Sequence, residues 1–252
     1  MAEHANIFAA NPRTFLGMNA VGVGNVAEAH APLNWQSTND AAYDFSIANR
    51  GNNRIPMLRI EAPAAAVETM QAKWCNTSQG AHANRFDEIS FCDFARMPGA
   101  GDARFVFTGA MNGCGFIVVS SVPFYAGGHK MPHLAASNLR LYHDRALTPL
   151  AAWHRAGFKV RFAAYGGAPP GVGPAPLGVN IADYNRHNYP WSYGGPPPTH
   201  MRGVMNFLYY TGGRWIFGSR HFHQNGATHE CNAVDIPPGR AGSSSTQFVP
   251  VF

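Results

Sequence analysis

Charged residues are scarce in this sequence of 252 residues. Asp, Glu, Lys and Arg together make up 13% of it, whereas soluble proteins commonly have about a quarter. No run of Lys or Arg is longer than two residues, although proteins that bind nucleic acid usually gather positive charge on one face. The net charge of +5 therefore indicates a general attraction to acidic partners, and we expect no nucleic-acid binding.

Long apolar stretches are also missing. No uninterrupted run approaches the roughly 20 residues that a membrane-spanning helix needs, so we expect no membrane span. The segment Met1–Ile7 lacks the basic residues and apolar stretch of a cleavable secretory signal. We therefore expect a protein that is made in soluble form and that leaves its cell, if at all, by a specialised route without such a signal.

Cysteines are few and far apart. They stand at positions 75, 92, 114 and 231, a spacing that resembles neither a small disulfide scaffold nor a zinc ribbon. We expect reduced thiols in a monomer that holds no metal and no cofactor.

Glycine and proline, by contrast, are plentiful, at 27 and 19 residues, so much of the chain should be turns and irregular connections. Apolar residues make up 46% of the sequence, enough for one packed domain that spans residues 1–252. The composition favours a loop-rich fold that contains β-structure over a helical bundle.

Local signals divide the chain into segments. Residues 1–60 have weak periodicity and are predicted to be irregular, apart from a strand at 56–60. Helix signals cover 62–74 and 148–157, and the second has threonine at its N-cap, proline in its first turn and glycine at its end. The other expected elements are strands at 104–108, 115–121 and 158–162, a long Pro- and Gly-rich loop at 168–198, a hairpin at 206–217 that turns at 211–213, and a final strand at 248–252.

The segment with the clearest chemistry surrounds Cys114. A strand ends, a glycine-containing turn follows, and Cys114 stands between Gly113 and Gly115 where the next strand begins. Glycines on both sides let the main chain approach a substrate closely, and paired N–H groups there can stabilise an oxyanion on an attacked carbonyl. The alternative is that Cys114 is a small buried hydrophobe, which is the usual state of a free cysteine.

A nucleophilic cysteine needs a base within hydrogen-bond reach, because only the thiolate attacks. Two histidines, His129 and His133, follow in the sequence. In a hairpin, Cys114 faces His133 if the turn is centred just after Pro123, and proline belongs in a turn rather than in a paired strand. His133 is therefore the preferred base. His129 would face Cys114 only with an earlier turn, and a turn at Gly127-Gly128 would place neither histidine opposite Cys114.

Residues 105–134 resemble the active-site segment of the cytotoxic-necrotizing-factor and Burkholderia-lethal-factor group of glutamine deamidase toxins. In that group an apolar strand leads into a Leu-Ser-Gly-Cys signature, and a histidine follows on the neighbouring strand. Here the signature reads Met111-Asn-Gly-Cys114, with asparagine in place of the usual serine. Thr108, six positions before the cysteine, matches a threonine of the lethal-factor branch.

The resemblance implies both a fold and an activity. The family fold has two packed mixed β-sheets flanked by helices, so the expected class is α+β with a sandwich-like, loop-rich core. The implied activity is that of a Cys-His amidohydrolase in which Cys114 attacks a glutamine amide, His133 moves the proton and Thr108 orients the imidazole. The gap from Cys114 to His129 fits the necrotizing-factor branch better. The hydroxyl of Thr108 could equally form a hydrogen bond with the backbone of the turn at the end of its own strand.

The resemblance also implies a partner and a place of action. The partner would be a protein with a reactive glutamine in a host or competitor cell, and the toxin would act in the cytosol of that cell. Neither the target glutamine nor the choice between deamidation and transglutamination follows from it, because an amine that intercepts the thioester gives the second reaction.

A second set of candidate functional residues lies near the C-terminus. His221 and His223 fall on one face of a strand, and Glu230 follows them, which loosely resembles the metal motif of cupins. The spacing departs from that motif, and metal sites demand tight ligand geometry. A cupin-like metalloenzyme is therefore an alternative, while histidines that cap a strand or face solvent are the simpler interpretation.

Aromatic residues gather in the Pro- and Gly-rich loop at Tyr184, Tyr189, Trp191 and Tyr193. They could form a recognition surface, as in a non-enzymatic, lectin-like or protein-binding module. They could equally pin the loop to the body of the protein. The pair His143-Asp144 is interpreted as part of a turn with a structural role.

Overall fold

The structure, a computed structural model, describes residues 4–19, 21–23, 42–48, 57–60, 67–76, 85–109, 111, 114–166, 178–184, 200–225, 231–233 and 246–252. Strands dominate these residues, and the α-helices among them are short. Within these ranges no helix is both long enough and apolar enough to cross a membrane.

The larger of two mixed sheets has nine strands. Two neighbouring pairs run parallel and the remaining pairs run antiparallel. The strand order is β1 (Gly22–Val23), β3 (Met57–Ile60), β2 (Ala42–Ala48), β4 (Met70–Cys75), β6 (Phe105–Thr108), β13 (His200–Thr211), β14 (Arg214–Asn225) and β15 (Cys231–Ala233), with β16 (Thr246–Pro250) also paired to β14.

The smaller sheet has five strands, and a separate two-stranded ribbon lies beside it. One pair in this sheet, β11 with β12, is parallel. The order is β12 (Asn180–Asp183), β11 (Val160–Tyr165), β7 (Gly115–Val119), β10 (Asn138–Asp144) and β5 (Phe91–Ala95), and the ribbon consists of β8 (Tyr125–Ala126) and β9 (His129–Lys130).

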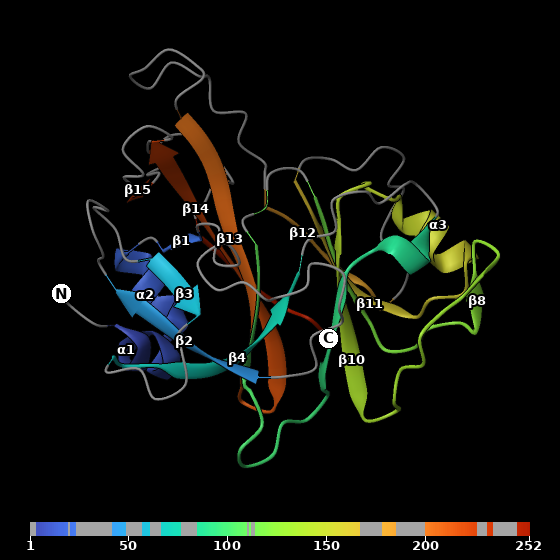
Figure 1. Cartoon of the computed structure of the whole chain (residues 1–252), viewed down its shortest axis with the longest axis horizontal. Helices are drawn as coiled ribbons and strands as arrows, with labels where there is room; N and C mark the ends of the chain where they lie inside the picture. Colours follow the sequence, from blue (N-terminus) through green and yellow to red (C-terminus); the bar gives the residue numbers. More distant parts are fainter. Residues whose placement is uncertain are drawn as a thin grey trace.

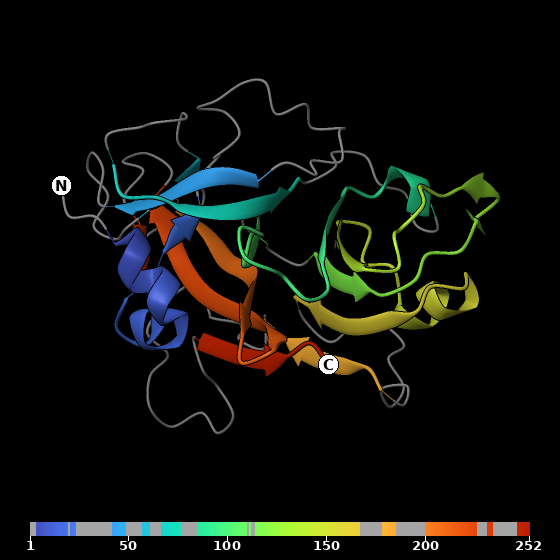
Figure 2. The same ribbon diagram turned by 90° about the horizontal axis from the view of Figure 1, so that it is seen from below.

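The sheets and helices form four layers (Figures 1 and 2). Helices α1 (Ala5–Ala10) and α2 (Pro12–Met18) cover the outer face of the larger sheet, where Phe8 packs beside Phe107 and Phe207. A second core lies between the sheets, and a third lies beneath α3 (Leu150–Arg155) and the 3-10 turn η1 (Phe86–Glu88). The expected class, α+β with two packed mixed sheets flanked by helices, is confirmed.

Strand β6 brings Thr108 into the space between the sheets. Successive side chains of a strand point to opposite faces. Phe105 and Phe107 accordingly join the core under the helices, while Val106 joins the core between the sheets. Thr108 follows this alternation and is fully buried on the inner side. The continuously apolar sequence of the strand thus fits a position that is covered on both faces.

The predicted hairpin is confirmed and is longer than the sequence indicated. β13 and β14 pair from His200–Asn225 down to Thr211–Arg214. The turn residues Gly212 and Gly213 have φ angles of 55° and 78°, as a tight two-residue turn requires.

Gly218 lies directly under an aromatic ring of this hairpin. It pairs with Phe207, and a Cβ atom at Gly218 would come within 2.6 Å of Phe207 Cε1. We expect Gly218→Ala to lower the free energy of unfolding by about 3 kcal/mol, because the ring must leave its packed position. Urea denaturation measures the change. Gly17→Ala is the matched control, since a Cβ there meets no atom within 4 Å; equal stability of the two variants would contradict the packing argument.

The predicted helix at 62–74 is wrong where the structure describes it, because Met70–Cys75 forms strand β4 between β2 and β6. Met70, Ala72 and Trp74 share the core under α1 and α2, so the apolar residues fit a period of two. The predicted helix at 148–157 is confirmed as α3, although its N-cap is Pro149 and not Thr148.

Two regions that were predicted to be irregular contain regular elements. Within residues 1–60 the structure has α1, α2, β1 and β2 besides the expected strand β3. Within residues 168–198 it has β12. Neither segment has a strong periodic pattern of apolar residues. Their strands join the two sheets, and α1 and α2 pack on the larger one.

Candidate active site

Cys114 stands immediately before β7, the central strand of the smaller sheet. Gly115 pairs with Asp144 on one side and with Tyr165 on the other. A Cβ atom at Gly115 would lie 3.4 Å from atoms of both neighbours, so the close approach of three strands favours glycine here. Cys114 is half-buried and packs against the core between the sheets.

Thr108 contacts an imidazole, and that imidazole belongs to His143. The Oγ1 atom of Thr108 lies 2.6 Å from Nδ1 of His143 and 2.8 Å from the carbonyl oxygen of Cys75. Thr108 comes from the larger sheet and His143 from β10 of the smaller sheet, so the contact bridges the two layers. The relative exposures of Thr108 and His143 are only 0% and 1%.

The hydrogen bonds of Thr108 determine the tautomer of His143. A hydroxyl group has one proton to donate, and Thr108 donates it to the carbonyl of Cys75. The Nδ1–H of His143 must then donate to Thr108 Oγ1, which leaves the lone pair on Nε2. Nε2 is buried and has no hydrogen-bond partner within the described part of the chain. His143 therefore holds a free proton acceptor in a fixed orientation.

The environment of His143 keeps it uncharged. Burial, together with the positive charge of Arg145, lowers its pKa to about 3. At neutral pH the ring is therefore in the form that can accept a proton. Burial also raises the pKa of Cys75, whose exposure is 0%, so this neighbouring thiol is poorly suited to act as a nucleophile.

Cys114 and His143 project toward the same side of the smaller sheet. Phe116 faces His143 across the β7–β10 ladder, so Cys114 is two residues away on the same face and is a diagonal neighbour of His143. Phe116 and Leu141 belong to the core between the sheets, which identifies this face as the inner one. The thiol of Cys114, the imidazole and the hydroxyl of Thr108 therefore lie on the same side of the smaller sheet, although Nε2 of His143 makes no hydrogen bond with the thiol in this structure.

The predicted pairing of Cys114 with His133 is wrong. β7 pairs with β10, where Phe116 faces His143, and no hairpin turns just after residue 123. The turn lies instead at Gly127–Gly128, whose φ angles are 57° and 84°, between β8 and β9. This is the arrangement that removes the hairpin support for both His129 and His133.

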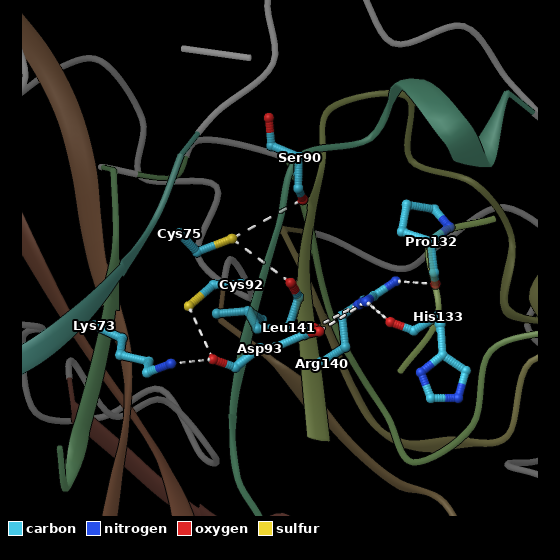
Figure 3. Close-up of polar contacts among 9 residues, drawn as sticks. All are labelled: Lys73, Cys75, Ser90, Cys92, Asp93, Pro132, His133, Arg140 and Leu141. Atoms are coloured by element: carbon cyan, nitrogen blue, oxygen red, sulfur yellow. Dashed lines mark hydrogen bonds and ion pairs between the residues drawn. The ribbon is translucent and has the colours of Figure 1, made fainter. Parts of the chain in front are cut away.

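His133 is exposed on the connection between β9 and β10. Arg140 binds its carbonyl oxygen at 3.0 Å and that of Pro132 at 2.9 Å, and it also binds Asp93 with bonds of 2.5 and 2.7 Å. Figure 3 shows the ring of His133 pointing away from Arg140. His129 lies on β9 with its Nδ1 atom 3.6 Å from a carboxylate oxygen of Asp87.

His143 is the residue that sequence reasoning missed. It was interpreted as part of a turn, but it belongs to strand β10. A usable signal was present, because Leu139, Leu141 and His143 alternate with Arg140 and Tyr142. That alternation predicts a strand with His143 on its apolar face.

The competing histidine pair is only partly within the described residues. His221 lies on β14 and is half-buried. The side chains of His223 and Glu230 lie outside the described residues, and so do Tyr189, Trp191 and Tyr193. Among the residues that are described, no group of three or more His, Cys, Asp or Glu side chains could hold a metal ion.

Comparison with known proteins adds little to this geometry. No family model matches the chain, and no curated protein matches it. Among solved structures, the C-terminal domain of CNFy from Yersinia pseudotuberculosis aligns with a TM-score of 0.34 and 7% sequence identity, over 80% of this chain and 76% of that chain. A similarity of this size carries no functional argument.

Proposed function

We propose that this chain is a cysteine-dependent protein glutamine deamidase of the toxin or effector type. The observation that carries the proposal is the hydrogen bond between Thr108 and His143, which leaves Nε2 of His143 free on the face that Cys114 shares. A thiol, an oriented neutral imidazole and a third group that holds the imidazole are the parts of a Cys-His hydrolase. The resemblance of residues 105–134 to the glutamine deamidase toxins supports the same activity.

The first half-reaction forms a thioester. His143 Nε2 takes the proton of Cys114, and the sulfur attacks the side-chain carboxamide carbon of a glutamine in the target protein. Main-chain N–H groups beside Cys114 stabilise the oxyanion. The imidazolium then gives its proton to the nitrogen, the C–N bond breaks and ammonia leaves.

The second half-reaction restores the thiol. His143 takes a proton from water, the resulting hydroxide attacks the thioester, the C–S bond breaks, and the imidazolium returns its proton to the departing sulfur. The products are glutamate in the target and the Cys114 thiol, so one amide and one water give one carboxylic acid and one ammonia. Thr108 accepts the Nδ1–H bond throughout and stabilises the imidazolium when it forms.

The partner and place of action belong to the same proposal. The partner is a protein with an accessible glutamine in a host or competitor cell. The protein acts as a monomer in the cytosol of that cell. His133, the base predicted from sequence, is replaced in this mechanism by His143.

The proposal is tested by mass spectrometry of cell lysate treated with the wild-type protein and with Cys114→Ser. We expect the wild type to convert a small set of glutamines to glutamate, with a mass increase of about 1 Da each, and the variant to convert none. Cys92→Ser is the matched control, because Cys92 is a fully buried thiol on β5. Conversion by Cys114→Ser at the wild-type level would exclude the mechanism.

A further inference from the structure

Tyr184 links the end of β12 to the main chain of Cys114. Its hydroxyl donates a hydrogen bond to the carbonyl oxygen of Cys114, and its N–H donates to the carbonyl oxygen of Tyr165 at 3.1 Å. The side chain is fully buried in the core between the sheets. One interpretation of the aromatic residues in the Pro- and Gly-rich loop was that they hold the loop against the body of the protein. For Tyr184 this interpretation is confirmed.

The bond falls where the regular ladder ends. β11 pairs with β7 as far as Tyr165 and Gly115, and Cys114 is the next residue beyond that pair. The hydroxyl of Tyr184 therefore satisfies a carbonyl just outside the last ladder pair. Because the peptide unit is planar, a fixed carbonyl also fixes the plane that joins Cys114 to Gly115.

We propose that Tyr184 is a positioning residue for the nucleophile, an inference that rests on the proposed function of Cys114. Its hydroxyl holds the Cys114 peptide and so fixes the position from which the thiol must reach Nε2 of His143. Misplacement of a reacting group by about 1 Å can cost a factor of about 10² in rate. Tyr184 thus acts on the reaction through Cys114, without touching the substrate.

A purely structural role makes a different prediction. A buried hydroxyl needs some partner, and any nearby carbonyl would meet that need without affecting the chemistry. Tyr165 is such a case, because it is also buried and its hydroxyl donates to the carbonyl of Thr148 at 3.3 Å. Tyr165→Phe is therefore the matched control for Tyr184→Phe, since each change removes one buried hydroxyl and keeps the ring.

The experiment measures the rate at which iodoacetamide alkylates Cys114, by mass spectrometry of the labelled peptide, between pH 5 and 10. We expect Tyr184→Phe to react about tenfold more slowly than the wild type at pH 7. We also expect its pH profile to shift toward that of an unassisted thiol, near 8.5, as in His143→Gln. Tyr165→Phe should keep the wild-type rate and profile, while thermal melting confirms that both variants are folded.

The outcomes separate the two proposals. A Tyr184→Phe rate within twofold of wild type, with an unchanged profile, would overturn the positioning role while the reactive Cys114 of the wild type still supports the function. An equal loss in Tyr184→Phe and Tyr165→Phe would also overturn it, because it would show a general loss of packing. A wild-type Cys114 no more reactive than a free thiol would overturn the proposed function and the role of Tyr184 with it.

Discussion

Replacing His143 with glutamine is expected to lower the rate of glutamine-to-glutamate conversion by about 10²–10⁴-fold, the usual contribution of a general acid–base group. Glutamine keeps a polar side chain that can reach Thr108, but it has no nitrogen that accepts and returns a proton. The thiol of Cys114 would then have no group to take its proton as the sulfur attacks. The loss should appear in the rate of the chemical step.

The measurement compares His143→Gln with His133→Gln, which makes the same substitution at an exposed histidine. Conversion of target glutamines and alkylation of Cys114 are followed for both. We expect His133→Gln to retain the wild-type rates. If His133→Gln lost activity and His143→Gln kept it, the base would be the histidine that the sequence predicted, and the connection between β9 and β10 would have to fold back toward Cys114.

The elements that the sequence predicted well are those with strong local signals. β6 and β7 are largely apolar runs, α3 is followed by Gly157 with a φ angle of 92°, and the β13–β14 turn has two glycines. Each of these signals depends on a few adjacent residues. Thr108 and Cys114 could therefore be placed at strand ends before any tertiary contact was known.

The partner strand of β7 could not be predicted in this way. A hairpin between neighbouring strands is the shortest solution, but residues 120–137 form a long excursion before β10 returns to pair with β7. Arg140 holds the end of this excursion through the carbonyls of Pro132 and His133, and its carboxylate partner Asp93 is 47 positions away. Such contacts leave no periodic pattern around Cys114.

The contact between Thr108 and His143 was hidden for a related reason. It joins two sheets across a core, and it needs the register of β7 with β10 as well as the packing of one sheet on the other. The sequence places Thr108 at the end of an apolar strand, and it places His143 in an alternation of apolar and polar residues. Only the assembled layers bring the two side chains to 2.6 Å.

The burial of His143 should also make the fold sensitive to acid. Burial lowers its pKa to about 3, whereas a histidine in the unfolded chain has a pKa of about 6.5. Between these values the unfolded chain binds a proton that the folded protein does not, so a fall in pH favours unfolding. From pH 7 to pH 5 this one residue should lower the free energy of unfolding by about 2 kcal/mol.

Urea denaturation of the wild type and of His143→Gln at pH 7 and pH 5 isolates this effect. The variant has no group that titrates at this position, so the pH-dependent loss should be about 2 kcal/mol smaller than in the wild type. Asp144, whose pKa is raised by burial, acts in the opposite direction, because its buried carboxyl binds a proton more readily than in the unfolded chain. It is present in both proteins and cancels in the difference. An equal loss in wild type and variant would mean that His143 is protonated in the folded protein at pH 5, in which case its Nε2 would no longer be the free acceptor that the mechanism needs.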